Sequence, residues 1–208
     1  MLTVTRLEPQ KKNPQRVNVY LDGEFAFGIS RAAAPWLAEG NQISQQKINA
    51  LQEKDQFETA YQRAINFLSY RIRSEKEIRQ NLIKHETPEG IVEQVLDRLR
   101  GASLVNDREF ASSWVGNRIR FKPRGKRALT SELIQKGIEN EIIEEALLGI
   151  DEEELAYACA RSRISKFSGL DEKTFKKKLS SLLTRRGFPY HVVNDVVISL
   201  WTGMQKES

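Results

Sequence analysis

One apolar pattern occurs three times between Ala60 and Leu200, and it restricts the chain to a repeat architecture. In each copy an alanine is followed after 22 or 23 residues by a leucine, and then by a block of apolar residues at three- and four-residue spacing. This spacing predicts helices, and a period of about 50 residues predicts small helix clusters that stack to cover their apolar faces. The alanine and leucine pairs are Ala60 and Leu82, Ala111 and Leu133, and Ala156 and Leu179.

We therefore predict a mainly α fold, a tandem array of three three-helix repeats that resemble helix-turn-helix units. A small N-terminal module of a β-hairpin and short helices precedes the array. Such arrays usually bind extended partners along a surface rather than carry out chemistry in a pocket. The predicted domains are residues 1–57, 58–106, 107–150 and 151–208.

The N-terminal module is predicted from a turn signal between two alternating runs. Asp22-Gly23 stands there, as expected for a type I′ turn whose two central residues need positive φ. Residues 3–7 are expected to supply a third strand, since a lone hairpin is only marginally stable. Serines that can cap helices predict one short helix over residues 30–37 and another from residue 44 to about residue 57.

Charge is segregated along the chain, although the net charge is only +5. Residues 118–127 contain six basic side chains and no acid, and residues 173–186 show the same count. Residues 139–154 contain eight acids and no base. A basic face for a polyanion with a separate acidic face explains this segregation, and a solvated helix surface explains any single run equally well.

Two copies carry a pair of cations at the junction between their first and second helices. Arg71 and Arg73 stand there in the first copy, and Lys122 and Arg124 stand at the same register in the second. The third copy has Phe167-Ser168-Gly169 at this place, and its cations lie in the second helix and the turn that follows it. Cations at repeated junctions suit a helical polyanion, through phosphate contacts that carry affinity but little sequence information.

The sequence lacks the residue patterns of most catalytic and metal sites. Cys159 is the only cysteine and lies between alanines, which predicts a buried thiol, while His85 and His191 have no carboxylate at triad or metal spacing. Neither glycine-rich phosphate-loop pattern occurs. The acids of residues 151–154 begin a predicted helix, where they favour the positive end of the helix dipole. We expect no catalytic residue, no metal and no cofactor.

Two further expectations concern location and one aromatic residue. Residues 1–5 lack the basic start and apolar run of a signal peptide, and no stretch approaches the roughly 20 apolar residues of a membrane span. We expect a cytoplasmic protein with no membrane contact. Trp114 shares a predicted apolar stripe with Phe110 and Val115, which favours a buried position over a base-stacking platform.

Four short motifs occur in order at this repeat spacing: FLSYRIRSEKEI at 67–78, LVND at 104–107 with Phe110-Ala111, KPRG at 122–125 with Leu133 and Lys136–Ile138, and RRGF at 185–188. In these motifs the chain resembles the RecX family, the bacterial regulators of the RecA recombinase. The resemblance covers roughly residues 58–203, and the N-terminal hairpin is similar to an extension that some members carry. One departure is Ile72, where many relatives have proline.

The resemblance implies a non-enzymatic modulator, most often an inhibitor, that lies in the groove of the RecA filament on single-stranded DNA. It would suppress ATPase and strand exchange in recombination and the SOS response. The implied partners are the RecA filament and single-stranded DNA, with double-stranded DNA as a further candidate, and a monomer is expected. Candidate residues for binding DNA or the filament are Arg71, Arg73, Arg118, Arg120, Lys122, Arg124, Lys126, Arg127, Lys176, Lys177, Arg185 and Arg186.

Other roles stay open at this point. Some of these cations could instead pair with nearby acids, for instance Arg71 or Arg73 with Glu75 or Glu77. A sequence-specific duplex-DNA-binding transcription regulator of helix-turn-helix type is a second function, although few side chains that read base edges occur beyond residues 79–81. A purely protein-binding helical scaffold is a third, and it would bind no nucleic acid even at low salt.

Overall fold

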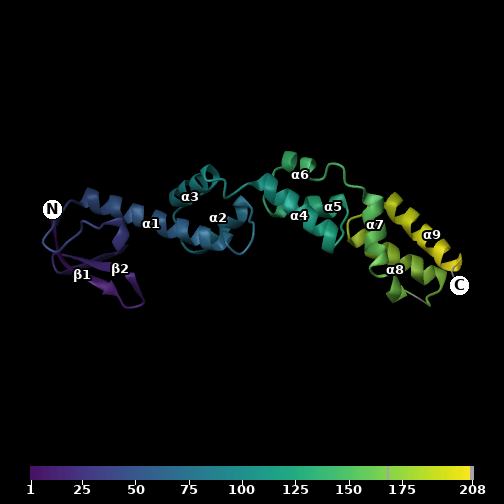
Figure 1. Ribbon diagram of the computed structural model, residues 1–208, viewed down its shortest axis with the longest axis horizontal. Helices are drawn as coiled ribbons and strands as arrows, with labels where there is room; N and C mark the ends of the chain where they lie inside the picture. The colour runs from purple at the N-terminus through teal and green to yellow at the C-terminus, as the bar shows by residue number, and fades with distance from the viewer. Residues whose placement is uncertain (168, 207–208) are drawn as a thin grey trace. The chain divides into compact units, whose positions relative to one another are not determined.

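The computed structural model describes residues 1–167 and 169–206, and it is mainly helical, as the repeat pattern predicts (Figure 1). Ser168 of the third junction and the last two residues of the fourth predicted domain lie outside the described residues. The chain divides into two compact units. The first unit comprises residues 1–72 and 77–105, and the second comprises residues 73–76 and the described residues from 106 onward.

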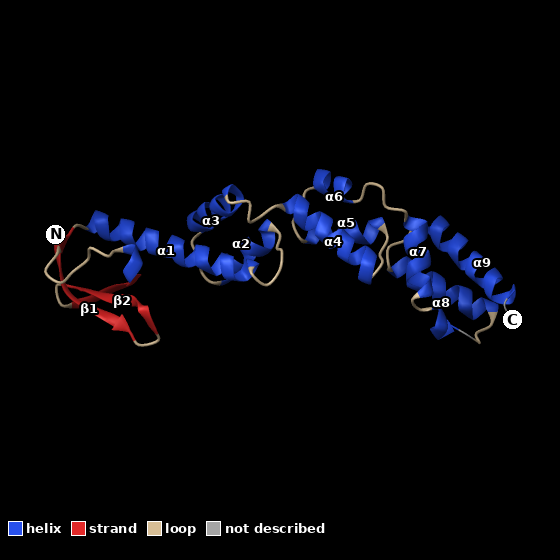
Figure 2. Cartoon of the chain, in the orientation of Figure 1, coloured by secondary structure: helices blue, strands red, loops and turns tan. Residues whose placement is uncertain are grey.

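The N-terminal module is a small antiparallel sheet, the only red segment in Figure 2. Its strands lie in the order β3-β2-β1-β4, so the third strand predicted near residues 3–7 is confirmed as β1. Asp22 and Gly23 have φ values of 49° and 93°, which confirms the predicted turn. The bounds are β1 (Leu2–Gln10), β2 (Asn13–Leu21), β3 (Glu24–Ser30) and β4 (Gln42–Ile43).

Two helix predictions in this module were wrong. The segment after Ser30 forms only the 3₁₀ turn η1 (Arg31–Ala33), because Pro35 has no N–H and disfavours the helical conformation of the residue before it. Ser44 does cap a helix, accepting from the Lys47 N–H, but that helix does not end near residue 57. It is α1 (Gln45–Leu68), and it continues because no glycine or proline interrupts it.

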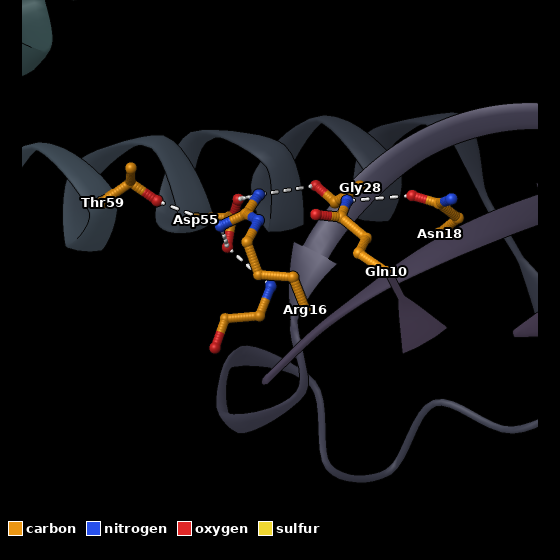
Figure 3. Close-up of polar contacts among 7 residues, drawn as sticks. Gln10, Arg16, Asn18, Gly28, Asp55 and Thr59 are labelled. Atoms are coloured by element: carbon orange, nitrogen blue, oxygen red, sulfur yellow. Dashed lines mark hydrogen bonds and ion pairs between the residues drawn. The ribbon is translucent and has the colours of Figure 1, made fainter. Parts of the chain in front are cut away.

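An ion pair fixes the sheet to α1 (Figure 3). Arg16 of β2 donates through Nη2 and Nη1 to the two carboxylate oxygens of Asp55, at 2.6 and 3.2 Å. The Ser30 N–H also donates to Asp55, at 2.8 Å, and the Gly28 carbonyl accepts from Arg16. Asp55 is only 5% exposed, so these donors supply the hydrogen bonds that water would otherwise make.

Each repeat has its own apolar core, and the predicted burial of the repeated alanines and leucines is confirmed. The three repeated alanines and the three repeated leucines are all 2% exposed or less. The first repeat combines the second half of α1 with α2 (Glu75–Lys84) and α3 (Glu89–Gly101). The second contains α4 (Asp107–Phe121), α5 (Lys126–Gln135) and α6 (Asn140–Ala146), and the third contains α7 (Glu152–Arg161), η2 (Ile164–Phe167), α8 (Glu172–Arg185) and α9 (Tyr190–Lys206).

Within the second unit, the second and third repeats meet backbone to backbone at two glycines. The Gly125 N–H donates to the Arg186 carbonyl at 3.0 Å, and Gly187 has a φ of +89°. A Cβ at Gly125 would lie 2.4 Å from the Gly187 oxygen, and a Cβ at Gly187 would lie 2.5 Å from Ala128 Cβ. The start of α5 is held by the same contact, because the Lys126 N–H donates to the Glu152 carboxylate at 2.8 Å.

Gly187→Ala is expected to lower the free energy of unfolding by about 2 kcal/mol, or roughly 8 °C in melting temperature, since it adds overpacking to left-handed strain. Thermal unfolding followed by circular dichroism measures this loss. Gly149→Ala is the matched control, because Gly149 also has positive φ but no atom lies within 4 Å of the added Cβ. An equal loss in the two variants would contradict the close approach of the repeats.

Candidate nucleic-acid interface

A basic cleft of about 620 Å³ lies in the second unit, lined by residues of α4, α5, the junction between them and the end of α8. Among its described lining residues five are cations and one is a carboxylate, Glu132. The cations are Arg118, Arg124, Arg127, Lys136 and Arg185. Because arginine presents a planar fork of donors, this lining suits phosphate or carboxylate groups.

Glu132 is the centre of the polar contacts in the cleft, with a side chain only 15% exposed. Its Oε2 accepts from Trp114 Nε1 and from Arg118 Nε, both at 2.7 Å. Its Oε1 lies 2.8 Å from Arg124 Nη1. The carboxylate thus joins α4, the junction and α5, and it fixes two guanidinium groups at the cleft wall.

The structure brings together four of the predicted binding residues in this cleft: Arg118, Arg124, Arg127 and Arg185. Lys136, which also lines it, was not predicted as a binding residue. It is the C-cap residue of α5, four residues after Glu132, and this i, i+4 spacing to a carboxylate was the signal available in the sequence.

Arg120, Lys122, Lys126 and Arg186 are among the predicted residues of the second unit that do not line the cleft. The Arg120 guanidinium lies 5.2 Å from the ring centre of Phe121, and Lys122 is exposed beside it. Lys126 and Arg186 are half-buried, and both use their backbone in the contact between the second and third repeats.

A second groove, of about 650 Å³, runs along α8 and combines cations with apolar side chains. The predicted residue Lys177 lines it together with Lys173, Lys178 and Arg185, so that Arg185 borders both hollows. Lys176 lines neither hollow, and its ammonium group lies 2.5 Å from the carboxylate of Glu172 on the same helix.

The cation pair of the first junction also lies outside the cleft. Arg71 forms an ion pair with Glu77 at 3.0 Å, which is the alternative role considered for it, and its side chain remains 44% exposed. Arg71 is part of the first unit, whereas Arg73 packs with the second.

Trp114 differs from the prediction that it is buried. It is half-buried and lines the cleft, with its ring stacked on Phe110 at a centroid distance of 5.7 Å. The indole N–H needs an acceptor, which holds the residue at the edge of the apolar stripe beside Glu132. Arg118 and Lys136 lie over its ring at 4.4 and 5.2 Å, so cations rather than a base cover it.

Three titratable side chains, Cys159, Asp107 and Asp151, have structural surroundings. Cys159 is buried as predicted, and burial raises the pKa of its thiol, which keeps it protonated. Burial likewise raises the pKa of Asp107, whose carboxylate accepts from the Glu75 N–H at 2.9 Å. Asp151 caps α7, as predicted for an acid at a helix start.

The described residues also give two negative findings. They include no group of three or more histidine, cysteine, aspartate or glutamate side chains placed to hold a metal ion. In the same residues, no helix combines the length and the apolar character that crossing a membrane requires.

Comparison with known families gives four matches in chain order. The model of the regulatory protein RecX N-terminal domain matches residues 2–49. The models of the first, second and third three-helix domains of RecX match residues 60–99, 106–147 and 151–197.

Individual relatives cover nearly the whole chain. The regulatory protein RecX of Bacillus subtilis (strain 168) is 32% identical over 196 residues, which are 92% of this chain and 74% of that protein. That of Clostridioides difficile (strain 630) is 31% identical over 202 residues, 95% of each chain. A crystal structure of regulatory protein RecX covers 94% of this chain and 98% of its own, with a TM-score of 0.69 and 31% identity. RecX from Lactobacillus salivarius covers 71% of this chain and 97% of its own, with a TM-score of 0.62 and 25% identity.

Proposed function

The chain belongs to the RecX family, and from this premise we propose that it regulates the RecA recombinase by binding the RecA filament on single-stranded DNA. In this role it suppresses the ATPase and strand exchange of RecA, acts in the cytoplasm and catalyses no reaction of its own. The observation that carries the proposal is the basic cleft of the second unit, where five cations surround a single carboxylate.

The chemistry of the cleft supports contact with a nucleic-acid backbone rather than with base edges. Four of its five cations are arginines, whose forked donors match the non-bridging oxygens of a phosphate. Such contacts fix a protein on a polyanion without reading its sequence, as a protein that follows a filament of any sequence requires. We propose that Arg118, Arg124, Arg127 and Arg185 make them.

The acidic segment supports a second kind of contact, with protein. Its residues Glu141 and Glu144 are exposed on α6, whereas Asp151 and Glu152 serve the starts of helices. Exposed acids complement a basic protein surface and steer association with it. We propose that α6 faces basic protein surface of the filament while the cleft binds its DNA.

The duplex-specific regulator is less well supported, because one of its three candidate base-reading side chains is paired within the protein and another has its amide oxygen buried. Arg79 donates to Glu93 at 2.9 Å and to Glu89 at 2.7 Å. The Oδ1 atom of Asn81 is buried, which leaves Gln80 as the exposed candidate. A recognition helix needs several free side chains that reach base edges.

The test is the single-stranded-DNA-dependent ATPase rate of the cognate RecA while this protein is titrated in. We expect a dose-dependent fall, because the bound protein holds the filament in a state that does not turn over. An ATPase that depends on single-stranded DNA but is unrelated to RecA is the control, and its rate is expected to stay constant at the same concentrations. An unchanged RecA rate at saturation would contradict the proposal, and a footprint confined to one short duplex would favour the duplex-specific regulator.

A further inference from the structure

We infer that the cleft of the second unit is a binding site for a backbone phosphate and that Glu132 is a built-in competitor for this phosphate. The inference rests on the proposed function, since it takes a nucleic acid as the ligand. It adds the place where a phosphate binds and the group that this phosphate must displace.

The carboxylate of Glu132 presents two anionic oxygens to donors that also suit a phosphodiester. One oxygen accepts from Trp114 Nε1 and Arg118 Nε at 2.7 Å, and the other lies 2.8 Å from Arg124 Nη1. A phosphodiester has two non-bridging oxygens of the same charge character, and arginine binds either group through parallel N–H donors. Glu132 therefore occupies the donors that a phosphate would use.

The fold of a repeat does not require a carboxylate at this position. The residue just before the repeated leucine is Asn81 in the first copy, Glu132 in the second and Lys178 in the third. All three copies nevertheless bury that leucine completely. A carboxylate found in only one copy, and inside the basic cleft that this copy lines, indicates a role in the cleft rather than in the packing of the repeat.

The cleft offers a phosphate further donors that Glu132 leaves unused. The Nε atom of Arg124 is buried and, among the described residues, has no hydrogen-bond partner. Arg127 and Arg185 are exposed, and within the described part of the chain their side chains form no ion pair. A phosphate that enters beside them would gain charge-assisted hydrogen bonds and at the same time weaken the contacts of Glu132.

Lys136 provides a place for the displaced carboxylate. It is the C-cap residue of α5, four residues after Glu132, and lines the same cleft. A glutamate placed four residues before a lysine forms a favourable pair on a helix surface. When a phosphate binds, it replaces the Glu132 carboxylate at the arginines. The affinity for nucleic acid is therefore lower, and release is easier, than in an arginine cleft without a carboxylate.

The experiment compares wild type with Glu132→Gln for binding of a fluorescent thymidine homopolymer, by anisotropy over a series of salt concentrations. We expect the variant to bind about tenfold more tightly at low salt, because its uncharged amide competes less well than a carboxylate. The slope of log K against log salt should become steeper by roughly 0.7, as for one additional phosphate contact on a single strand. Glu53→Gln is the matched control, since it makes the same change in net charge at an exposed position on α1, outside the cleft and outside α6.

Three results would overturn the inference, and one of them would overturn the proposed function as well. If wild type binds the homopolymer and Glu132→Gln binds equally or more weakly, Glu132 only orients the arginines and the inference is wrong, while the proposed function stands. If Glu53→Gln tightens binding as much as Glu132→Gln, the effect is one of net charge and the inference is again wrong. Absence of binding by wild type even at low salt would overturn the proposed function and the inference with it. Should Glu132→Gln fail to fold, Glu132→Asn, which introduces the residue of the first copy, serves as the second variant.

Discussion

Replacing Arg127 and Arg185 together by glutamate is expected to weaken binding of single-stranded DNA about a hundredfold at low salt. Both side chains are exposed at the cleft, so the variant removes two phosphate contacts and adds two repulsive charges. The slope of log K against log salt should fall by about 1.4, since each contact on a single strand contributes about 0.7. Anisotropy of a labelled homopolymer at several salt concentrations measures both quantities.

These two residues test the cleft more cleanly than Arg124 and Lys126, a pair in the basic run of residues 118–127. Arg124 is bound to Glu132, and the Lys126 backbone is part of the contact between repeats, so changes there also affect stability. The control is a double reversal of Lys11 and Lys12, which are exposed in the N-terminal module and change the net charge equally. Affinity that stays at the wild-type value in the cleft variant would refute the assignment of the site.

Asp55→Ala is expected to lower the free energy of unfolding by about 3 kcal/mol, or roughly 12 °C in melting temperature. The change leaves the Arg16 guanidinium and the Ser30 N–H without their carboxylate at a position that is almost inaccessible to water (Figure 3). Removing one partner of a buried pair costs far more than the pair itself contributes, because a charge remains without compensation. Thermal unfolding of the full chain, followed by circular dichroism, measures the loss.

Asp97→Ala is the matched control for this prediction. Asp97 also pairs with an arginine, Arg100, at 2.5 Å, but both side chains are largely exposed. An exposed pair of this kind contributes at most about 1 kcal/mol. A similar loss of stability in both variants would show that burial of Asp55 is not the source of its effect.

The repeats and the hairpin were predictable because their signals are local. Helical periodicity places Ala60, Leu82 and their counterparts on buried faces whatever the neighbouring repeat does. Asp22 and Gly23 favour positive φ by their own chemistry. One error arose where two local signals competed, because Ser30 can cap a helix but Pro35 ends that helix early. The other arose because the capping signal of Ser44 marks where α1 begins and carries no information on where it ends.

The binding site was predictable only in part. Arg118, Arg124 and Arg127 stand close together in the sequence, but only the packing of α8 against the second repeat brings Arg185 to them. Within a run of cations, the sequence alone does not separate those that line a cleft from those, such as Arg120 and Lys122, that do not. The role of Glu132, which lies on α5, depends on donors from α4 and from the junction, and no spacing in one segment reveals them.

The unbroken course of α1 has a mechanical consequence. At 1.5 Å per residue its 24 residues form a rod about 36 Å long, which starts against the sheet and ends in the core of the first repeat. A bend in the middle would break successive backbone hydrogen bonds, and no proline or glycine eases that cost. Within the first unit, α1 therefore holds the sheet and the first repeat at a fixed distance and a fixed relative rotation. A partner that binds the sheet therefore also sets the orientation of the first repeat, without any further contact.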